Sequence, residues 1–192
     1  MGRSRAFDEQ EVLERAMQHF WSHGYHESSL SDLLAAMGIS RQSLYDTFGN
    51  KRSLFVRVIE HYRNTQLRHA LELLGRDASP RQNVEAVLGF FAALASDLRG
   101  RGCLVANALV EVGSRDPELT RLLEETLGLL QSGLRAALER ARELGEIPAE
   151  RSPLALSRAL INAMVGMAVT GKLRPEADVL RDIHQGTLAL LG

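Results

Sequence analysis

The sequence predicts an all-α protein of about nine helices, and three observations support this fold class. Apolar residues recur with the three- and four-residue spacing of helices along most of the 192 residues. Glycine, proline and short polar stretches separate these periodic segments, and only 5 prolines are present. The alternating pattern of a half-buried strand is absent from the sequence, and Leu and Ala are abundant. An α/β or all-β fold is therefore excluded.

The composition is that of an ordinary globular protein. Hydrophobic residues make up 45% and charged residues 24%, and the formal net charge is -1. Because total charge is balanced, a nucleic-acid site must be argued from local placement of charge. The single cysteine, Cys103, excludes an intramolecular disulfide framework. The longest mostly apolar stretch, residues 160–169, is shorter than the ~20 residues of a membrane span, and the first residues lack the pattern of a signal peptide. We expect a cytoplasmic protein without a membrane partner.

The N-terminal part contains four expected helices, at residues 8–21, 31–37, 41–47 and 51–74. Acidic residues in the first turn favour the start of the first helix, and Gly24 is suited to end it. Ser29 and Ser40 are N-cap residues for the second and third helices, and Gly38 separates the two. We assign residues 1–50 to a helix-turn-helix domain, 51–75 to a connecting helix, and 76–192 to an effector-binding and dimerisation domain.

The C-terminal part contains five further expected helices, at residues 81–98, 103–112, 117–144, 153–170 and 176–191. Pro117 and Pro153 suit the first turn of a helix, where a missing N–H costs nothing. Glycine-containing segments interrupt the pattern between these helices. This arrangement predicts a second helical layer behind the N-terminal domain.

Residues 28–55 carry the clearest functional pattern. Two short helices joined at Gly38 are typical of a helix-turn-helix, whose second helix enters the DNA major groove. Its N-terminal end would present Arg41, Gln42 and Ser43 to base edges. Arginine pairs with guanine and glutamine with adenine, whereas serine is adaptable. The residues expected near the DNA backbone are Tyr45, Thr47 and Lys51.

This segment resembles the TetR family of bacterial transcriptional regulators. The residues that match the family pattern are Ser28, Ser29, Leu30, Asp32, Leu33, Gly38, Ile39, Ser40, Leu44, Tyr45, Phe48, Lys51, Leu54 and Phe55. The resemblance implies a homodimer that binds double-stranded DNA at a near-palindromic operator, usually as a repressor. A small molecule in the C-terminal domain would change the separation of the two reading units.

Position by position, the resemblance places Arg41, Gln42 and Ser43 on bases, and it places four residues on phosphates: Ser29, Tyr45, Thr47 and Lys51. Asp46 and Thr47 replace the aromatic residue and histidine of many members. A carboxylate at position 46 would repel phosphates unless it turned inward. Arg3 and Arg5 are either a basic arm onto DNA or a frayed tail.

The Gly102-Cys103-Leu104 segment is similar to the NemR/AcuR-like branch, some of whose members sense electrophiles through such a cysteine. A helix start beside Arg99 and Arg101 would favour the thiolate of Cys103, whereas the alternative is an inert packed cysteine. Candidate lining residues of an effector pocket, each also readable as plain core, are Phe90, Phe91, Leu94, Asn107, Val110 and Leu127.

The last two helices are expected to form the dimer interface because they hold more apolar surface than one layer can hide. The residues proposed for that interface are Leu160, Met164, Met167, Ile183 and Leu188. His19 and His23 lack the further ligands of a metal site, and we expect neither a metal nor a cofactor. Two rival functions are a helical thiol-dependent enzyme, which leaves the helix-turn-helix unexplained, and an architectural helical dimer, which loss of sequence-specific DNA binding would favour. We therefore expect a protein that is not an enzyme.

Overall fold

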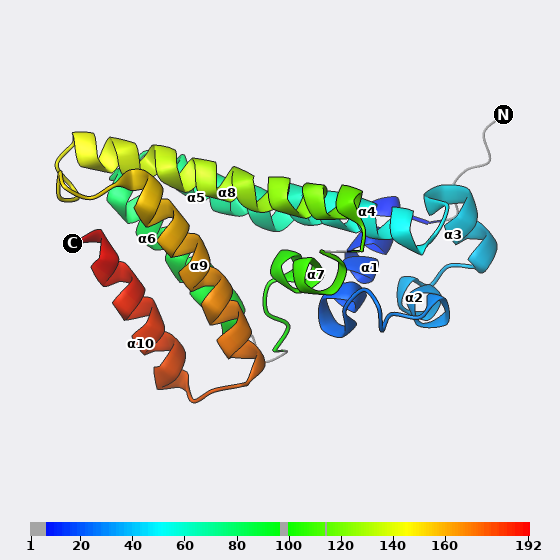
Figure 1. Ribbon diagram of the computed structural model, residues 1–192. Helices are drawn as coiled ribbons and strands as arrows, with labels where there is room; N and C mark the ends of the chain where they lie inside the picture. The colour runs from blue at the N-terminus through cyan, green and yellow to red at the C-terminus, as the bar shows by residue number, and fades with distance from the viewer. Residues whose placement is uncertain (1–6, 97–99, 114) are drawn as a thin grey trace.

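The computed structural model describes residues 7–96, 100–113 and 115–192, and its regular elements are helical throughout these ranges. Figure 1 shows α1 to α4 and α7 at one end of an elongated molecule and α6, α9 and α10 at the other. The N-terminal elements are α1 (Glu9–His23), α2 (Leu30–Met37), α3 (Arg41–Phe48), α4 (Lys51–Tyr62), a π-helical segment (Arg63–Leu67) and α5 (Arg68–Leu74). They are followed by α6 (Pro80–Ala95), α7 (Leu104–Val112), α8 (Pro117–Glu143), α9 (Pro153–Lys172), α10 (Ala177–Leu188) and a 3₁₀ turn (Ala189–Leu191).

The expected helix starts are confirmed by side-chain caps. Asp8, Ser29, Ser40 and Asp116 each accept a hydrogen bond from a backbone N–H in the first turn of the helix that follows. Gly38 adopts φ 69°, the left-handed conformation that the turn between α2 and α3 requires. These local signals fix the helix-turn-helix before any long-range packing is considered.

Several boundaries differ from the expectation. The helix expected over residues 51–74 contains the π-helical segment, in which one extra residue per turn separates α4 from α5. The last helix ends as a 3₁₀ turn, and α7 begins at Leu104 with Cys103 as its N-cap residue. The π-helical segment lies where the long helix passes from one hydrophobic core to another.

Two hydrophobic cores divide the molecule, and the division does not follow chain order. The first core joins the buried faces of α1 to α4 with α7 and with Leu119 and Leu123 at the start of α8. The second joins α5, α6, α9 and α10 with the later turns of α8, from Leu130 to Ala141. The α4–α5 segment and α8 therefore run through both cores.

One helix, α9, is long and apolar enough to cross a membrane by length and composition alone. Its side chains at Leu160, Met164 and Met167 are buried against the rest of the chain. Such burial explains the apolar composition of α9, because a central core helix meets the same requirement.

Candidate nucleic-acid interface and ligand cavity

The exposed end of α3 presents the residues expected to read bases. Arg41 and Gln42 are exposed in its first turn, and α3 lies at the extremity of the molecule in Figure 1. Ser43 is half-buried, and its backbone N–H donates to Ser40 Oγ over 3.0 Å. The two Oγ atoms are also 3.0 Å apart, so the hydroxyl of Ser43 is partly committed to the helix cap.

Asp46 is exposed and does not turn inward. The Gln42 amide donates from Nε2 to Asp46 Oδ1 over 2.7 Å, one helical turn away on the same face of α3. Asp46, which departs from the family pattern, therefore contacts Gln42, a residue expected to read bases. The four-residue spacing of Gln42 and Asp46 on a helix could have predicted this contact from the sequence.

The expected phosphate-contacting residues lie in three different settings. Ser29 caps α2 and donates to Asp32 Oδ2 over 2.5 Å, whereas Tyr45 projects from α3 with 46% of its surface exposed. Thr47 is half-buried and lines an open groove between α3, α4 and α8. Lys51 is half-buried; its Nζ donates to the His26 carbonyl over 3.3 Å and lies 4.8 Å from the centre of the Tyr25 ring. Arg3 and Arg5 lie outside the described residues.

Three contacts join the helix-turn-helix unit to distant parts of the chain. Arg52 binds the carboxylates of Asp116 and Glu118 at the start of α8, with nitrogen–oxygen distances of 2.6 to 2.9 Å. The Arg52–Asp116 pair is only partly buried, but its two hydrogen bonds fix the orientation of the guanidinium relative to the carboxylate. The sequence separation of more than 60 residues hides such a pair from pattern analysis.

The second contact is made by Glu111, near the end of α7. Its Oε2 accepts the backbone N–H groups of Tyr25 and His26 over 2.7 and 3.0 Å. A Cβ atom on Gly24, at φ 84°, would collide with this carboxylate, so a glycine is needed there for two reasons. The carboxylate thereby holds the loop between α1 and α2 against α7.

The third contact is the Trp21 indole, which donates from Nε1 to the Gly102 carbonyl over 2.8 Å. The Arg101 guanidinium lies 4.6 Å from the centre of the same indole and also binds Gln18. The Tyr62 ring meets Trp21 edge to face at 5.5 Å. The residues before α7 are therefore anchored on α1 and α4.

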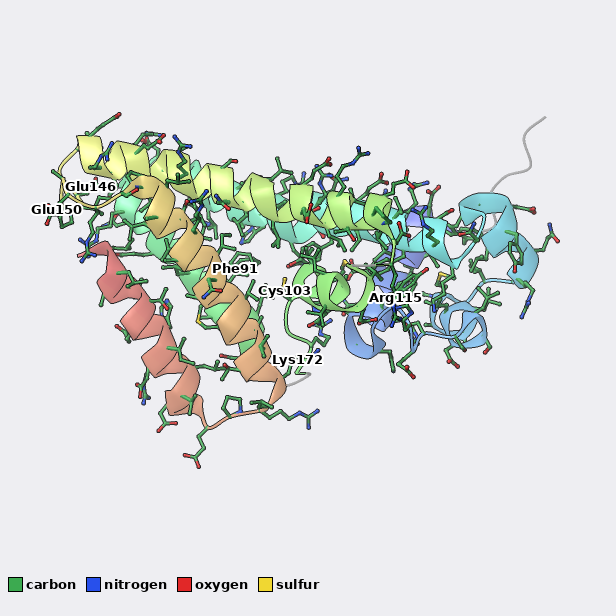
Figure 2. The ribbon with its side chains drawn as sticks, in the orientation of Figure 1. Phe91, Cys103, Arg115, Glu146, Glu150 and Lys172 are labelled. Atoms are coloured by element: carbon green, nitrogen blue, oxygen red, sulfur yellow. The ribbon has the colours of Figure 1, made fainter. Side chains whose placement is uncertain are left out.

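Cys103 lies between two small adjoining apolar hollows, with volumes of about 30 and 20 Å³. The side chains that line both hollows come from α6, the start of α7 and α8: Phe91, Cys103, Leu127 and Leu130. Tyr62 and Thr126 add hydroxyl groups to the first, and Ile161, Met164 and Val165 of α9 complete the second. Figure 2 shows Phe91 and Cys103 in the middle of the molecule, near α9.

The environment of Cys103 does not favour its thiolate. Burial raises the pKa of the thiol, and this effect outweighs the opposing N–H groups at the start of α7 and the Tyr62 hydroxyl. The Tyr62 oxygen lies 4.0 Å from Sγ. The guanidinium of Arg101 is bound to Trp21 and Gln18, and Arg99 lies outside the described residues. Of the two alternatives for Cys103, this environment favours the packed cysteine over a thiolate activated at rest, because desolvation disfavours the charged form.

Other effector candidates lie elsewhere. Phe90 packs edge to face on His69 at 4.9 Å, and Val110 is 89% exposed. Asn107 donates to the Arg101 carbonyl over 2.8 Å and accepts from Lys172 over 3.1 Å, so its amide fastens the segment before α7. Leu94 is half-buried on α6. The structure therefore brings together Phe91, Cys103 and Leu127 of the expected pocket.

The expected interface residues lie on the inner side of α9 and α10. Leu160, Met164 and Met167 are buried within the chain's own core, and Ile183 and Leu188 pack against that core. The outer faces of these helices expose a mixed set of residues. It includes the small or apolar Gly166, Val169, Val179 and Gly186 and the polar or charged Arg158, Asn162, Asp178, Arg181, Asp182 and Gln185. A partner chain would meet this outer set first.

His19 and His23 stack with ring centres 4.3 Å apart on the outer side of α1. Burial and the neighbouring His23 lower the pKa of His19. Among the described residues, no group of three or more His, Cys, Asp and Glu side chains is arranged to hold a metal ion.

Comparison with known proteins places this geometry among characterised regulators. Residues 12–58 match the model of the bacterial regulatory proteins of the tetR family, and residues 80–186 match a tetracyclin repressor-like C-terminal domain. The chain is 34% identical to the uncharacterized HTH-type transcriptional regulator YezE of Bacillus subtilis (strain 168), over the full length of both. It is 29% identical to the HTH-type transcriptional repressor ComR of Escherichia coli (strain K12), with 98% of this chain and 91% of ComR covered.

A solved structure gives the same result. The TetR family transcriptional regulator CifR, as a cysteine mutant complexed with a 26-base-pair double-strand operator DNA, is 29% identical to this chain. The match covers 97% of this chain and 98% of CifR, with a TM-score of 0.85. The agreement therefore extends over both cores and is not confined to the helix-turn-helix.

Proposed function

The chain belongs to the TetR family of DNA-binding transcriptional regulators, and we propose that it is a homodimeric repressor released from its operator by a small apolar ligand. It would act in the cytoplasm on a near-palindromic site. The observation that carries the proposal is the pair of hollows around Cys103, because Tyr62 lines one of them from α4, the helix that directly follows the helix-turn-helix domain.

The size of the DNA site that one α3 can contact favours a dimer. Each chain offers one α3, which covers a few base pairs, so strong preference for one site requires two copies. In a dimer formed through α9 and α10, the two α3 helices would have to lie about one DNA turn apart, roughly 34–36 Å, or a small multiple of that distance. The repressor names of relatives such as ComR support the direction of control.

The cavity is connected to the reading head by short contacts. Tyr62 packs on Trp21 of α1, and Trp21 binds Gly102, the residue before Cys103. Glu111 holds the other end of α7 to the loop before α2. A ligand that displaces α7 or Tyr62 would therefore shift α1 and α2 as well. A change of a few kcal/mol between two spacings is sufficient to move most of the population.

The lining specifies the chemistry of the effector. Most lining atoms are apolar, and the polar groups are the Tyr62 and Thr126 hydroxyls and the Cys103 thiol. The Thr126 hydroxyl is already donated to the Leu122 carbonyl over 2.7 Å. A small apolar molecule with one polar group facing Tyr62 and Cys103 would match this lining, and its entry would have to widen the two hollows, which are too small to hold it as they stand. An electrophile that alkylates Cys103 is the alternative, and adduct volume would then drive the same displacement.

The test combines operator selection with ligand release. DNA bound by the protein is selected from a random pool, and the complex is then titrated with small apolar molecules and with a quinone. Leu127→Phe fills the cavity, whereas Leu129→Phe adds the same volume at a 41% exposed position on α8. We expect both variants to bind the operator and only Leu127→Phe to lose release.

Two outcomes contradict the proposal. Equal release from both variants places the effector outside the cavity, and absence of any selected sequence favours an architectural dimer. A Cys103→Ser variant separates the two effector classes, because it blocks release by the quinone and preserves release by a reversible ligand.

A further inference from the structure

The hydrogen bond between Gln42 and Asp46 constrains the orientation of the glutamine amide. Both side chains are exposed on α3, and the nitrogen–oxygen distance is 2.7 Å. An ionised carboxylate accepts hydrogen bonds and has none to donate, so the amide nitrogen, and not its oxygen, must face Asp46. An aspartate one turn along the helix therefore removes the two-fold ambiguity of a glutamine amide.

The remaining edge of the amide then has a defined polarity. A primary amide has two N–H hydrogens, and the bond to the carboxylate uses one of them. When that hydrogen is the one trans to the carbonyl oxygen, the second hydrogen and Oε1 stay side by side and unused by Asp46. This donor–acceptor pair complements the N7 acceptor and the N6 donor of adenine in the major groove.

We propose that Asp46 is a positioning residue for base recognition, which holds the Gln42 amide so that its adenine-pairing edge faces the DNA. The inference rests on the proposed reading of bases by α3 and extends it to a residue that touches no base. It also accounts for a carboxylate on the face that approaches DNA. The negative charge acts on phosphates, which are the same in every sequence, so its cost falls on every sequence equally.

Two separate effects of Asp46 are therefore expected. Its charge lowers affinity for all DNA, because it adds repulsion against phosphates. Its hydrogen bond raises preference for adenine over the other bases at a single position in each half-site. A charge-assisted bond between residues four apart on a helix corresponds to about two- to fivefold in that preference.

The experiment measures binding of the full chain to the selected operator and to each single-base variant at the position that Gln42 reads. Asp46→Asn keeps the size of the side chain but can donate as well as accept, so the Gln42 amide is free to turn over. We expect discrimination at that position to fall about two- to fivefold, with a simultaneous rise in affinity for random DNA. Glu27→Gln is the control, because it removes an exposed carboxylate of the same unit.

A double-mutant cycle shows whether Asp46 acts through Gln42. In a Gln42→Ala background, Asp46→Asn should still raise affinity for random DNA but should leave discrimination unchanged. The inference is overturned if Asp46→Asn preserves discrimination that Gln42→Ala removes, or if it changes discrimination equally in both backgrounds. It is also overturned if Gln42→Ala leaves the selected sequence intact. A wild-type chain that selects no sequence contradicts the proposed function itself.

Discussion

The Arg52 guanidinium and the Asp116 carboxylate form a two-point ion pair between the first turn of α4 and the N-cap of α8. Nε lies 2.6 Å from Oδ2 and Nη2 lies 2.9 Å from Oδ1, and Asp116 also accepts the Leu119 N–H over 3.0 Å. Since the α4–α5 segment and α8 both run through the two hydrophobic cores, this pair joins the ends of the two long segments that the cores share.

Acid titration provides the first prediction. The bonds from Arg52 and from the Leu119 N–H lower the pKa of Asp116 from 3.8 to about 2. A depressed pKa stabilises the folded state above the unfolded value of 3.8, and this contribution is lost as the pH falls toward about 2. The stability difference between wild type and Asp116→Asn should therefore be constant near neutral pH and shrink below pH 3.8.

Urea unfolding at a series of pH values measures this difference. Asp77→Asn, in the turn before α6, is the matched control for loss of one carboxylate. A difference between wild type and Asp116→Asn that does not change with acid would show that the ion pair contributes no stability.

The second prediction concerns the loop that Glu111 holds. Glu111→Ala removes the acceptor for the Tyr25 and His26 N–H groups, and we expect a loss of about 1 kcal/mol because water replaces it at this partly exposed site. Amide hydrogen exchange should accelerate at these two residues, while α9 is unaffected. Glu111→Gln retains a carbonyl acceptor, so equal acceleration in both variants would argue against the hydrogen bonds as the cause.

The third prediction separates base contacts from phosphate contacts. Arg41→Ala should relax preference at one base position in each half-site, at about 1–3 kcal/mol. Lys51→Ala should weaken binding to every sequence and lower the salt slope by about one. The measurements are operator selection and titration at several salt concentrations. If Arg41→Ala selects the same sequence as the wild type, Arg41 does not contact a base.

The fourth prediction concerns the reactivity of Cys103. Because burial raises the pKa of its thiol, alkylation of Cys103 by iodoacetamide should be slow at neutral pH. Its rate should still rise with pH at values where the rate for a free cysteine has reached its plateau. Mass spectrometry over a pH series gives the rate. A plateau near neutral pH would identify an activated thiolate and favour the electrophile alternative over the reversible ligand.

The fifth prediction concerns the dimer face. A Cβ atom on Gly166 of α9 meets nothing within 4 Å, so Gly166→Arg leaves the single chain intact and places a charge on the outer face. We expect sedimentation to show a shift from dimer to monomer, together with weaker operator binding. Gly128→Arg, equally open on α8, should stay dimeric. A dimeric Gly166→Arg would place the interface elsewhere.

Local sequence signals determined much of this protein. Caps such as Ser29 and Ser40, the left-handed Gly38 and the spacing of apolar residues act within a few positions, so the helices and the helix-turn-helix could be predicted from them. The matches at Tyr45 and Lys51 extended this prediction to a family, and the family comparisons confirm it. The exposed Arg41 and Gln42 lie where that prediction expected them.

The tertiary structure alone decided which distant residues meet. It paired Arg52 with Asp116 and Glu111 with the loop after α1, and it buried Leu160 inside the chain while turning Gly166 outward. It also raised the pKa of Cys103, because desolvation depends on every element packed around the thiol, whereas its sequence neighbours indicate only a helix start. Periodicity shows that a helix has an apolar face, but packing selects the neighbour that covers it.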